Sequence, residues 1–243
     1  MEIVKKILTW LVLPAAIVCL GYLCVKSVME PVNYNKIKES REQVGIERLK
    51  DIRTLQSAFK SANNRYAGTI DSLKLFYNEG KIDVVMQIGS ADDSVAVANT
   101  KALKKKQPKI TPEQMLAIYE AGTPLVFAIK NQIAVKDTLC KREGFCVDSL
   151  AFIPFCGDSV IMNTTIKTVS GVKVPLFEAK MPWAVKNEDG NIEGVLLKGL
   201  NHQLIVNSYY ERVDFYGKED TGRYPGLMVG SIDSPNNNAG NWE

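Results

Sequence analysis

An uncharged apolar run near the N-terminus constrains this chain more than any other feature. Residues 7–25 read ILTWLVLPAAIVCLGYLCV and contain no Asp, Glu, Lys or Arg. A helix of that length rises about 28 Å, close to the hydrocarbon thickness of a bilayer. The run therefore predicts one transmembrane helix, to which we assign residues 7–28, after a short cytoplasmic segment of residues 1–6. The residues expected to face lipid are Ile7, Trp10, Leu11, Pro14, Ile17, Leu20, Tyr22 and Val25.

Three other kinds of segment share such a run: a cleaved signal peptide, a lipoprotein signal and a buried helix of a soluble protein. A cleavage site needs small residues, but residues 26–30 read KSVME. A lipoprotein site needs a small residue before its cysteine, and Cys19 and Cys24 each follow a large aliphatic residue. An uncleaved signal anchor is favoured. Lys5 and Lys6 before the run favour a cytoplasmic N-terminus and a domain on the other side of the membrane.

The charge balance of the chain argues against a nucleic-acid partner. Lys and Arg number 30 and Asp and Glu number 27 in the 243 residues, so no large basic field is expected. The one basic cluster joins Lys101, Lys109 and residues 104–106. It predicts a solvated helix face or loop, with contact to phospholipid headgroups as the alternative.

The residues that usually carry catalysis are scarce. His202 is the only histidine, so one chain cannot build a His-based triad or a two-His metal site. The glycine-rich motifs of nucleotide-binding proteins are missing as well. We expect no catalytic residue, no metal site and no cofactor, and therefore a protein that is not an enzyme.

The anchor is followed by a second helical pattern. Pro31 predicts a break or kink after the anchor, because a helix usually stops before the residue that precedes a proline. Residues 36–62 are rich in helix formers, and Ile52, Leu55 and Phe59 fall on one face. That stripe predicts packing against the chain's own domain or, as the alternative, a seam with another subunit.

The first 80 residues carry a pattern found in a known family. After the apolar helix and its amphipathic continuation, residues 51–59 read DIRTLQSAF, residues 63–66 read NNRY, and Ser72-Leu73 lies in a short helix. This resembles the type IV pilins and the pseudopilins of type II secretion. The family's Gly before the apolar run and Glu within it are missing here. The resemblance therefore implies a pilin-like protein that stays in the membrane, without the site for the prepilin peptidase.

After Gly80 the pattern changes to short strands. Residues 82–88, 125–129, 132–139 and 146–155 predict strands, and Ser170-Gly171 predicts the turn of a hairpin within residues 160–180. Thr111, Pro112 and Gln114 form a helix-start signature, and residues 204–215 read as a strand or a short helix. The predicted fold class is α+β, with a helical region of residues 32–80 packed on a mostly antiparallel sheet domain of residues 81–243.

Two cysteines of the domain could pair. Cys140 and Cys146 flank Gly144, which can turn the chain, so a disulfide could form in an oxidising compartment. The alternative is that the domain cysteines are free buried thiols.

Location and resemblance together give the expected role. The pattern predicts a structural subunit of a bacterial secretion, motility or assembly complex, held in the inner membrane with its C-terminal domain in the periplasm or outside. The expected partners are the lipid bilayer and other subunits of an envelope complex, including further copies of itself. The alternative is a membrane-tethered hydrolase or carbohydrate-binding envelope protein.

Overall fold

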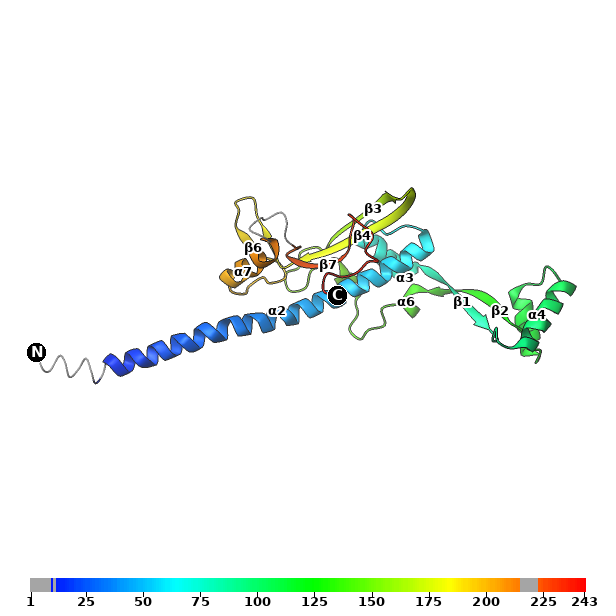
Figure 1. The fold of residues 1–243 in the computed structure, drawn as a ribbon, viewed down its shortest axis with the longest axis horizontal. Helices are drawn as coiled ribbons and strands as arrows, with labels where there is room; N and C mark the ends of the chain where they lie inside the picture. The colour runs from blue at the N-terminus through cyan, green and yellow to red at the C-terminus, as the bar shows by residue number, and fades with distance from the viewer. Residues whose placement is uncertain (1–9, 11, 215–222) are drawn as a thin grey trace, which may run out of the picture. The chain divides into compact units, whose positions relative to one another are not determined.

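A computed structural model describes residues 10, 12–214 and 223–243 (Figure 1). The architecture is α+β, with a long N-terminal apolar helix packed against antiparallel sheets. The chain divides into two compact units. The first joins Met1–Arg53, Gly68–Ile70 and Asp148–Glu243, and the second joins Thr54–Ala67 and Asp71–Val147. In the first unit, residues 148–243 return to the N-terminal 53 residues.

The helix α2 runs without interruption over Leu13–Asn63, which corresponds to about 76 Å of rise. The predicted break at Pro31 is wrong, since the helix continues through that residue. A proline removes one backbone donor and crowds the carbonyl four residues before it, at a cost of about 3 kcal/mol. The turns that follow contact the domain, through Tyr34 and Arg41.

The first unit is built around a three-stranded antiparallel sheet in the order β3-β4-β7. Its strands are β3 (Ile161–Val169), β4 (Val172–Pro182) and β7 (Gly226–Gly230). The predicted hairpin at Ser170-Gly171 is confirmed, with Val169 opposite Val172. The central strand β4 has Phe177, Ala179 and Met181 fully buried. The remaining elements of the unit are β5 (Ala184–Lys186), β6 (Ile192–Gly194) and α7 (His202–Val213).

The contact of α2 with this sheet depends on Gly45. A Cβ atom at this position would lie 2.7 Å from Cδ1 of Leu227 in β7 and 3.7 Å from the sulfur of Met181 in β4. The glycine that weakens helix propensity in the sequence therefore lies where the helix passes close to the sheet, with no room for a side chain. Further along the helix, Arg53 holds the C-terminal residue, with Nη1 donating to Oε1 of Glu243 at 2.6 Å.

The second unit contains the end of α2 and a two-stranded antiparallel ribbon, β1 (Lys81–Ile88) with β2 (Phe127–Ala134). The other elements of this unit are the helices α3 (Ile70–Glu79, from Asp71), α4 (Ser94–Lys106), α5 (Pro112–Glu120) and α6 (Val135–Thr138). The predicted helix start at Thr111 is confirmed as a capping box with Gln114. Met115, Leu125, Phe127 and Ile129 form a small core beside α5 and β2.

Three predicted strand segments need correction. Residues 125–129 and 132–139 contribute to one strand, β2, and the chain turns into α6 where the buried Val135 donates its N–H to the carbonyl of Gly80 at 3.0 Å. Residues 146–155 contain the 3-10 helix η2 (Val147–Ala151) in place of a strand. Residues 204–215 read as a strand or a short helix, and α7 confirms the helix, with Asn201 as its N-cap.

Candidate functional site

The anchor residues that the structure describes are all exposed. Trp10 is 84% exposed and Leu20 is 61% exposed, and Pro14, Ile17, Tyr22 and Val25 are also classed as exposed. Ile7, Leu11 and residues 1–6 lie outside the described residues. Within the described chain, α2 is the one helix long and apolar enough to cross a membrane or to act as a signal sequence. Apolar surface of this extent requires a nonaqueous environment or a partner.

Contact between α2 and the domain begins as soon as the apolar run ends. Nδ2 of Asn201, the residue that caps α7, donates to Oε1 of Glu30 at 2.6 Å. One turn later the buried Tyr34 hydroxyl lies 2.9 Å from the hydroxyl of Ser208. Two turns after that, Nη1 of Arg41 donates to the carbonyl of Leu196 at 3.0 Å. The domain is therefore held to α2 immediately beyond the predicted span.

The predicted interface residues lie inside the chain. Ile52 and Leu55 have no exposed surface, and Phe59 is half-buried, with its ring 5.1 Å from that of Phe76 in an edge-on arrangement. This burial agrees with the first of the two interpretations, packing within the chain. Ile52 and Leu55 have no surface to offer to a second subunit.

Cys140 and Cys146 lie on the two sides of a turn. Cys140 is half-buried with a φ of 54°, Cys146 is exposed, and Gly144 between them has a φ of 75°. The predicted role of Gly144 as a turn residue is confirmed by the hydrogen bond from the N–H of Phe145 to the carbonyl of Arg142 at 3.0 Å. The disulfide itself stays a prediction.

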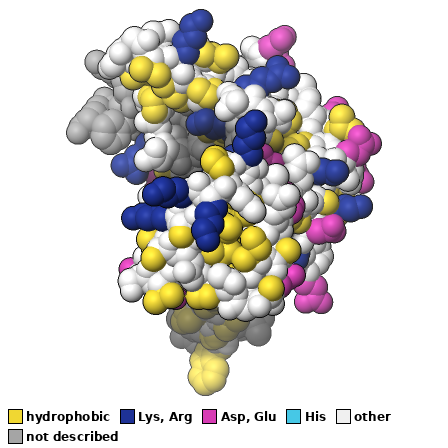
Figure 2. All heavy atoms as spheres, turned by 90° about the vertical axis from the view of Figure 1, so that its right-hand side faces the viewer, with side chains coloured by type: hydrophobic (Ala, Val, Ile, Leu, Met, Phe, Trp, Pro, Cys, Tyr) yellow, Lys and Arg dark blue, Asp and Glu magenta, His cyan; other side chains and the backbone are white. Residues whose placement is uncertain are grey.

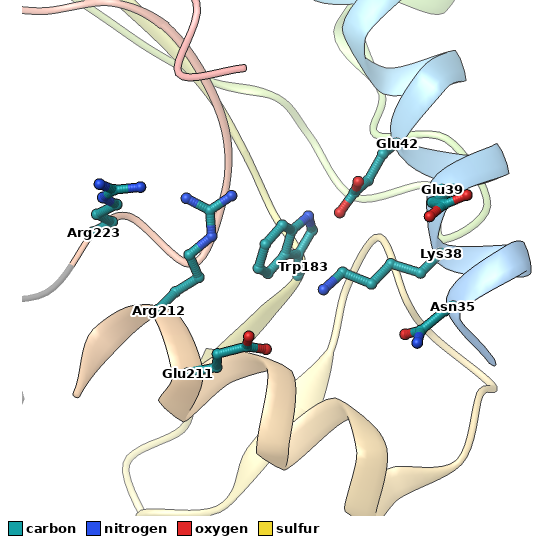
Figure 3. A pocket seen from close by; sticks show the side chains of 8 residues that line it. All are labelled: Asn35, Lys38, Glu39, Glu42, Trp183, Glu211, Arg212 and Arg223. Atoms are coloured by element: carbon teal, nitrogen blue, oxygen red, sulfur yellow. The ribbon is translucent and has the colours of Figure 1, made fainter. Parts of the chain in front are cut away.

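The first unit contains a cavity of about 580 Å³ that is lined by charged side chains. We call it the Trp183 cavity, and Figure 3 shows its side chains. Its wall comes from α2, from the residue between β4 and β5, from the end of α7 and from the segment before β7. The lining residues are Asn35, Lys38, Glu39, Glu42, Trp183, Glu211, Arg212 and Arg223.

The indole of Trp183 lies between two cations. Nζ of Lys38 is 4.0 Å from the ring centroid, and Cζ of Arg212 is 5.0 Å from it. A cation above an aromatic face contributes about 0.5–2 kcal/mol, and more when it is desolvated. The N–H of Arg223 donates to the carbonyl of Arg212 at 2.7 Å, which fixes the second arginine beside the first.

Two polar atoms of the cavity are buried without a partner. Trp183 is 4% exposed, and among the described residues neither its Nε1 nor Oε1 of Glu42 has a hydrogen-bond partner. In Figure 3 the carboxyl group of Glu42 is directed toward the nitrogen of the indole. An unpaired buried donor or acceptor costs about 1–3 kcal/mol, so a group that accepts from the indole and donates to the carboxylate would stabilise this part of the cavity.

Burial changes the acid–base properties of the cavity. It raises the pKa of the Glu42 carboxyl, an effect that the nearby charges of Lys38 and Arg212 reduce. It also lowers the pKa of the Lys38 amine. Both shifts favour the neutral form of the group, as expected in a medium of low dielectric constant.

We expect Glu42→Gln to flatten the pH dependence of the free energy of unfolding above pH 4.5. The folded protein holds the Glu42 proton more tightly than the unfolded chain, whose carboxyl titrates near 4.5. The free energy of unfolding therefore falls as the pH rises from 4.5 through the raised pKa, and the glutamine removes this fall. Urea unfolding of the full chain in detergent at several pH values measures it. Glu39→Gln, at an exposed position of the same wall, is the control and should keep most of the wild-type slope, because the charge of Glu39 is the smallest of the influences on the Glu42 pKa.

The basic cluster of residues 101–109 lies on α4 and just after it. All five lysines are exposed, and in the part of the chain that the structure describes none forms an ion pair. Figure 2, viewed from the side on which Figure 1 shows α4, has Lys and Arg side chains next to hydrophobic ones. The exposure agrees with a solvated face and leaves contact with lipid headgroups as a prediction.

Sequence reasoning did not find the Trp183 cavity. Its residues come from segments far apart in the sequence, and no local pattern joins them. The one signal was Lys38 four residues before Glu42, a spacing that brings two side chains together on a helix. His202, whose Nε2 lies 3.0 Å from the carbonyl of Ile192, is outside the cavity.

No protein-family model, no curated protein and no solved structure matches this chain.

Proposed function

We propose that this protein is a single-pass, pilin-like structural subunit of a bacterial envelope complex for secretion, motility or assembly. The observation that carries the proposal is the course of α2. The helix is apolar and exposed up to the end of the predicted span, and at Glu30 it enters the domain without a break. A membrane helix that continues as the spine of an α+β domain is the arrangement that the resemblance to pilins implies.

Lateral packing would use the exposed part of α2. Beyond the predicted span, Ile37 is 42% exposed and Val44 is 38% exposed. They are seven residues apart and share a helix face, as residues at a contact between helices do. They replace the buried Ile52 and Leu55 as the proposed contact residues. The domain would lie in the periplasm, since Lys5 and Lys6 favour a cytoplasmic N-terminus.

One observation also supports the alternative that the protein is a membrane-tethered carbohydrate-binding protein. A cleft with carboxylates and a tryptophan would support a membrane-tethered carbohydrate-binding protein, and the Trp183 cavity contains Glu39, Glu42 and Glu211.

We expect the full-length protein, extracted in mild detergent at its native expression level, to migrate as a large defined assembly. Val44→Glu should release subunits from it, because the variant places a charge on the proposed contact face. The matched control is Val172→Glu at the start of β4, where the valine is 63% exposed. A wild-type protein that migrates as a monomer would overturn the proposal. If both variants lose the assembly equally, Val44 is not a specific contact residue.

We expect Leu20→Arg to release much of the protein from the membrane fraction. An arginine near the middle of a span costs about 2.5–3.5 kcal/mol, which shifts insertion by about 100-fold. Leu75→Arg is the control, since Leu75 is 58% exposed in α3. Alkaline carbonate extraction followed by immunoblotting separates the two variants. Retention of both variants in the pellet would contradict the anchor.

A further inference from the structure

We propose that the Trp183 cavity binds a hydroxylated anion, a sugar-like molecule that carries a carboxylate or a phosphate group. The cavity measures about 580 Å³. One water molecule needs about 30 Å³, and small-molecule sites measure about 300–1,000 Å³. The space is therefore that of a ligand site. This inference rests on the cavity alone and holds whether or not the chain assembles with other subunits.

We call the part of the cavity at Nε1 of Trp183 and Oε1 of Glu42 its inner end. These two atoms determine which chemical group of a ligand can bind there. Nε1 of Trp183 must donate a hydrogen bond, and Oε1 of Glu42 must accept one while the carboxylate is charged. An ammonium group cannot accept from the indole, and a carboxylate or phosphate is repelled by Glu42. A hydroxyl group accepts and donates at once. The inner end therefore fits a hydroxyl, with a carboxamide as the other group of this kind.

The cationic side of the cavity selects the second group. Arg212 and Arg223 line it from the end of α7 and the segment that follows, and the hydrogen bond between their backbones keeps them together. The guanidinium group binds carboxylates and phosphates through paired, charge-assisted hydrogen bonds. In Figure 3 the two arginines lie on the side of Trp183 opposite Lys38. A ligand that carries an anionic group and a hydroxyl can satisfy both ends.

The ring of Trp183 has a supporting role. Lys38 and Arg212 lie 4.0 and 5.0 Å from its centroid, so the cations occupy the aromatic surface that would otherwise stack on a sugar. The indole contributes its N–H, which is a more directional contact than stacking. Recognition by this cavity would depend on polar groups at both ends and only weakly on the apolar faces of the ligand.

Calorimetric titration of the full-length protein in a sugar-free detergent tests the proposal. The probes are glucuronate and glucose 6-phosphate, compared with glucose, which lacks the anion, and inorganic phosphate, which lacks the ring hydroxyls. We expect at least one acidic sugar to bind at least about tenfold more tightly than either control, because it forms at least one additional charge-assisted hydrogen bond. The preferred acidic sugar distinguishes a carboxylate source from a phosphate source.

Two variants test the named contacts. Trp183→Phe keeps the ring and removes the N–H, and Arg223→Gln removes an exposed cation, so that variant should keep the wild-type fold. We expect each to weaken binding about tenfold. Equal affinity for inorganic phosphate and glucose 6-phosphate would mean a plain anion site and overturn the proposal. Tighter binding of N-acetylasparagine than of either acidic sugar, or no binding of either sugar at millimolar concentration, would also overturn it.

Discussion

Lys180→Met should lower the free energy of unfolding by about 3–5 kcal/mol, the cost of leaving a buried charge without its partner. Nζ of Lys180 lies 2.6 Å from Oε1 of Glu178 in β4, and the Glu178 side chain is 3% exposed. The contact is an ion pair without hydrogen-bond alignment. Tyr224 packs beside it, with its ring centroid 5.3 Å from Nζ, and burial together with the negative charge of Glu178 raises the pKa of this tyrosine.

The control for this variant is Lys167→Met in β3 of the same sheet. Lys167 pairs with Asp233 at 3.6 Å, and both side chains are largely exposed, so this change should cost at most about 1 kcal/mol. Replacing both members of the buried pair, as Glu178→Leu with Lys180→Met, should recover most of the loss. Thermal unfolding of the full chain in detergent measures all three. If Lys180→Met is as stable as Lys167→Met, the ion pair between Glu178 and Lys180 does not stabilise the sheet.

The second large effect is expected at Gln56, near the end of α2. Its side chain is fully buried and forms two hydrogen bonds with the backbone of Ala67. Nε2 donates to the carbonyl of Ala67 at 2.9 Å, and Oε1 accepts from its N–H at 2.9 Å. Gln56→Met keeps the length of the side chain and leaves both buried backbone groups unsatisfied. We expect a loss of about 2–6 kcal/mol, at about 1–3 kcal/mol for each group.

Gln203→Met gives the matched control for Gln56. Gln203 is exposed on α7, where its Nε2 donates a hydrogen bond to Oδ1 of Asn207 at 3.1 Å. Its replacement should change stability by less than about 0.5 kcal/mol. Hydrogen exchange at the Ala67 amide provides a local readout, since its protection should fall in Gln56→Met only. Unchanged protection there would contradict the proposed role of the glutamine.

Local sequence patterns predicted local structure well. The capping box at Thr111, the strand before Gly89 and the hairpin turn at Ser170-Gly171 each depend on residues a few positions apart. Predictions failed where distant packing decided the outcome. The helix passes through Pro31 and contacts the domain within a turn, and residues 146–155 do not form the predicted strand. The Trp183 cavity could not be predicted, since its walls meet only when residues 35–42 reach Trp183, the end of α7 and Arg223.

The unbroken course of α2 has a mechanical consequence. A membrane helix joined to its domain by a flexible linker can tilt in the bilayer without moving the domain, but α2 has no such joint at Pro31. From Met29 to Asn63 the helix rises about 50 Å. A change in tilt of about 10°, well within the range that bilayer thickness imposes on single helices, would displace its far end by about 9 Å. In the proposed membrane arrangement the helix would therefore act as a lever, so that a change in membrane thickness or in the crowding of neighbouring helices would change the position of the domain.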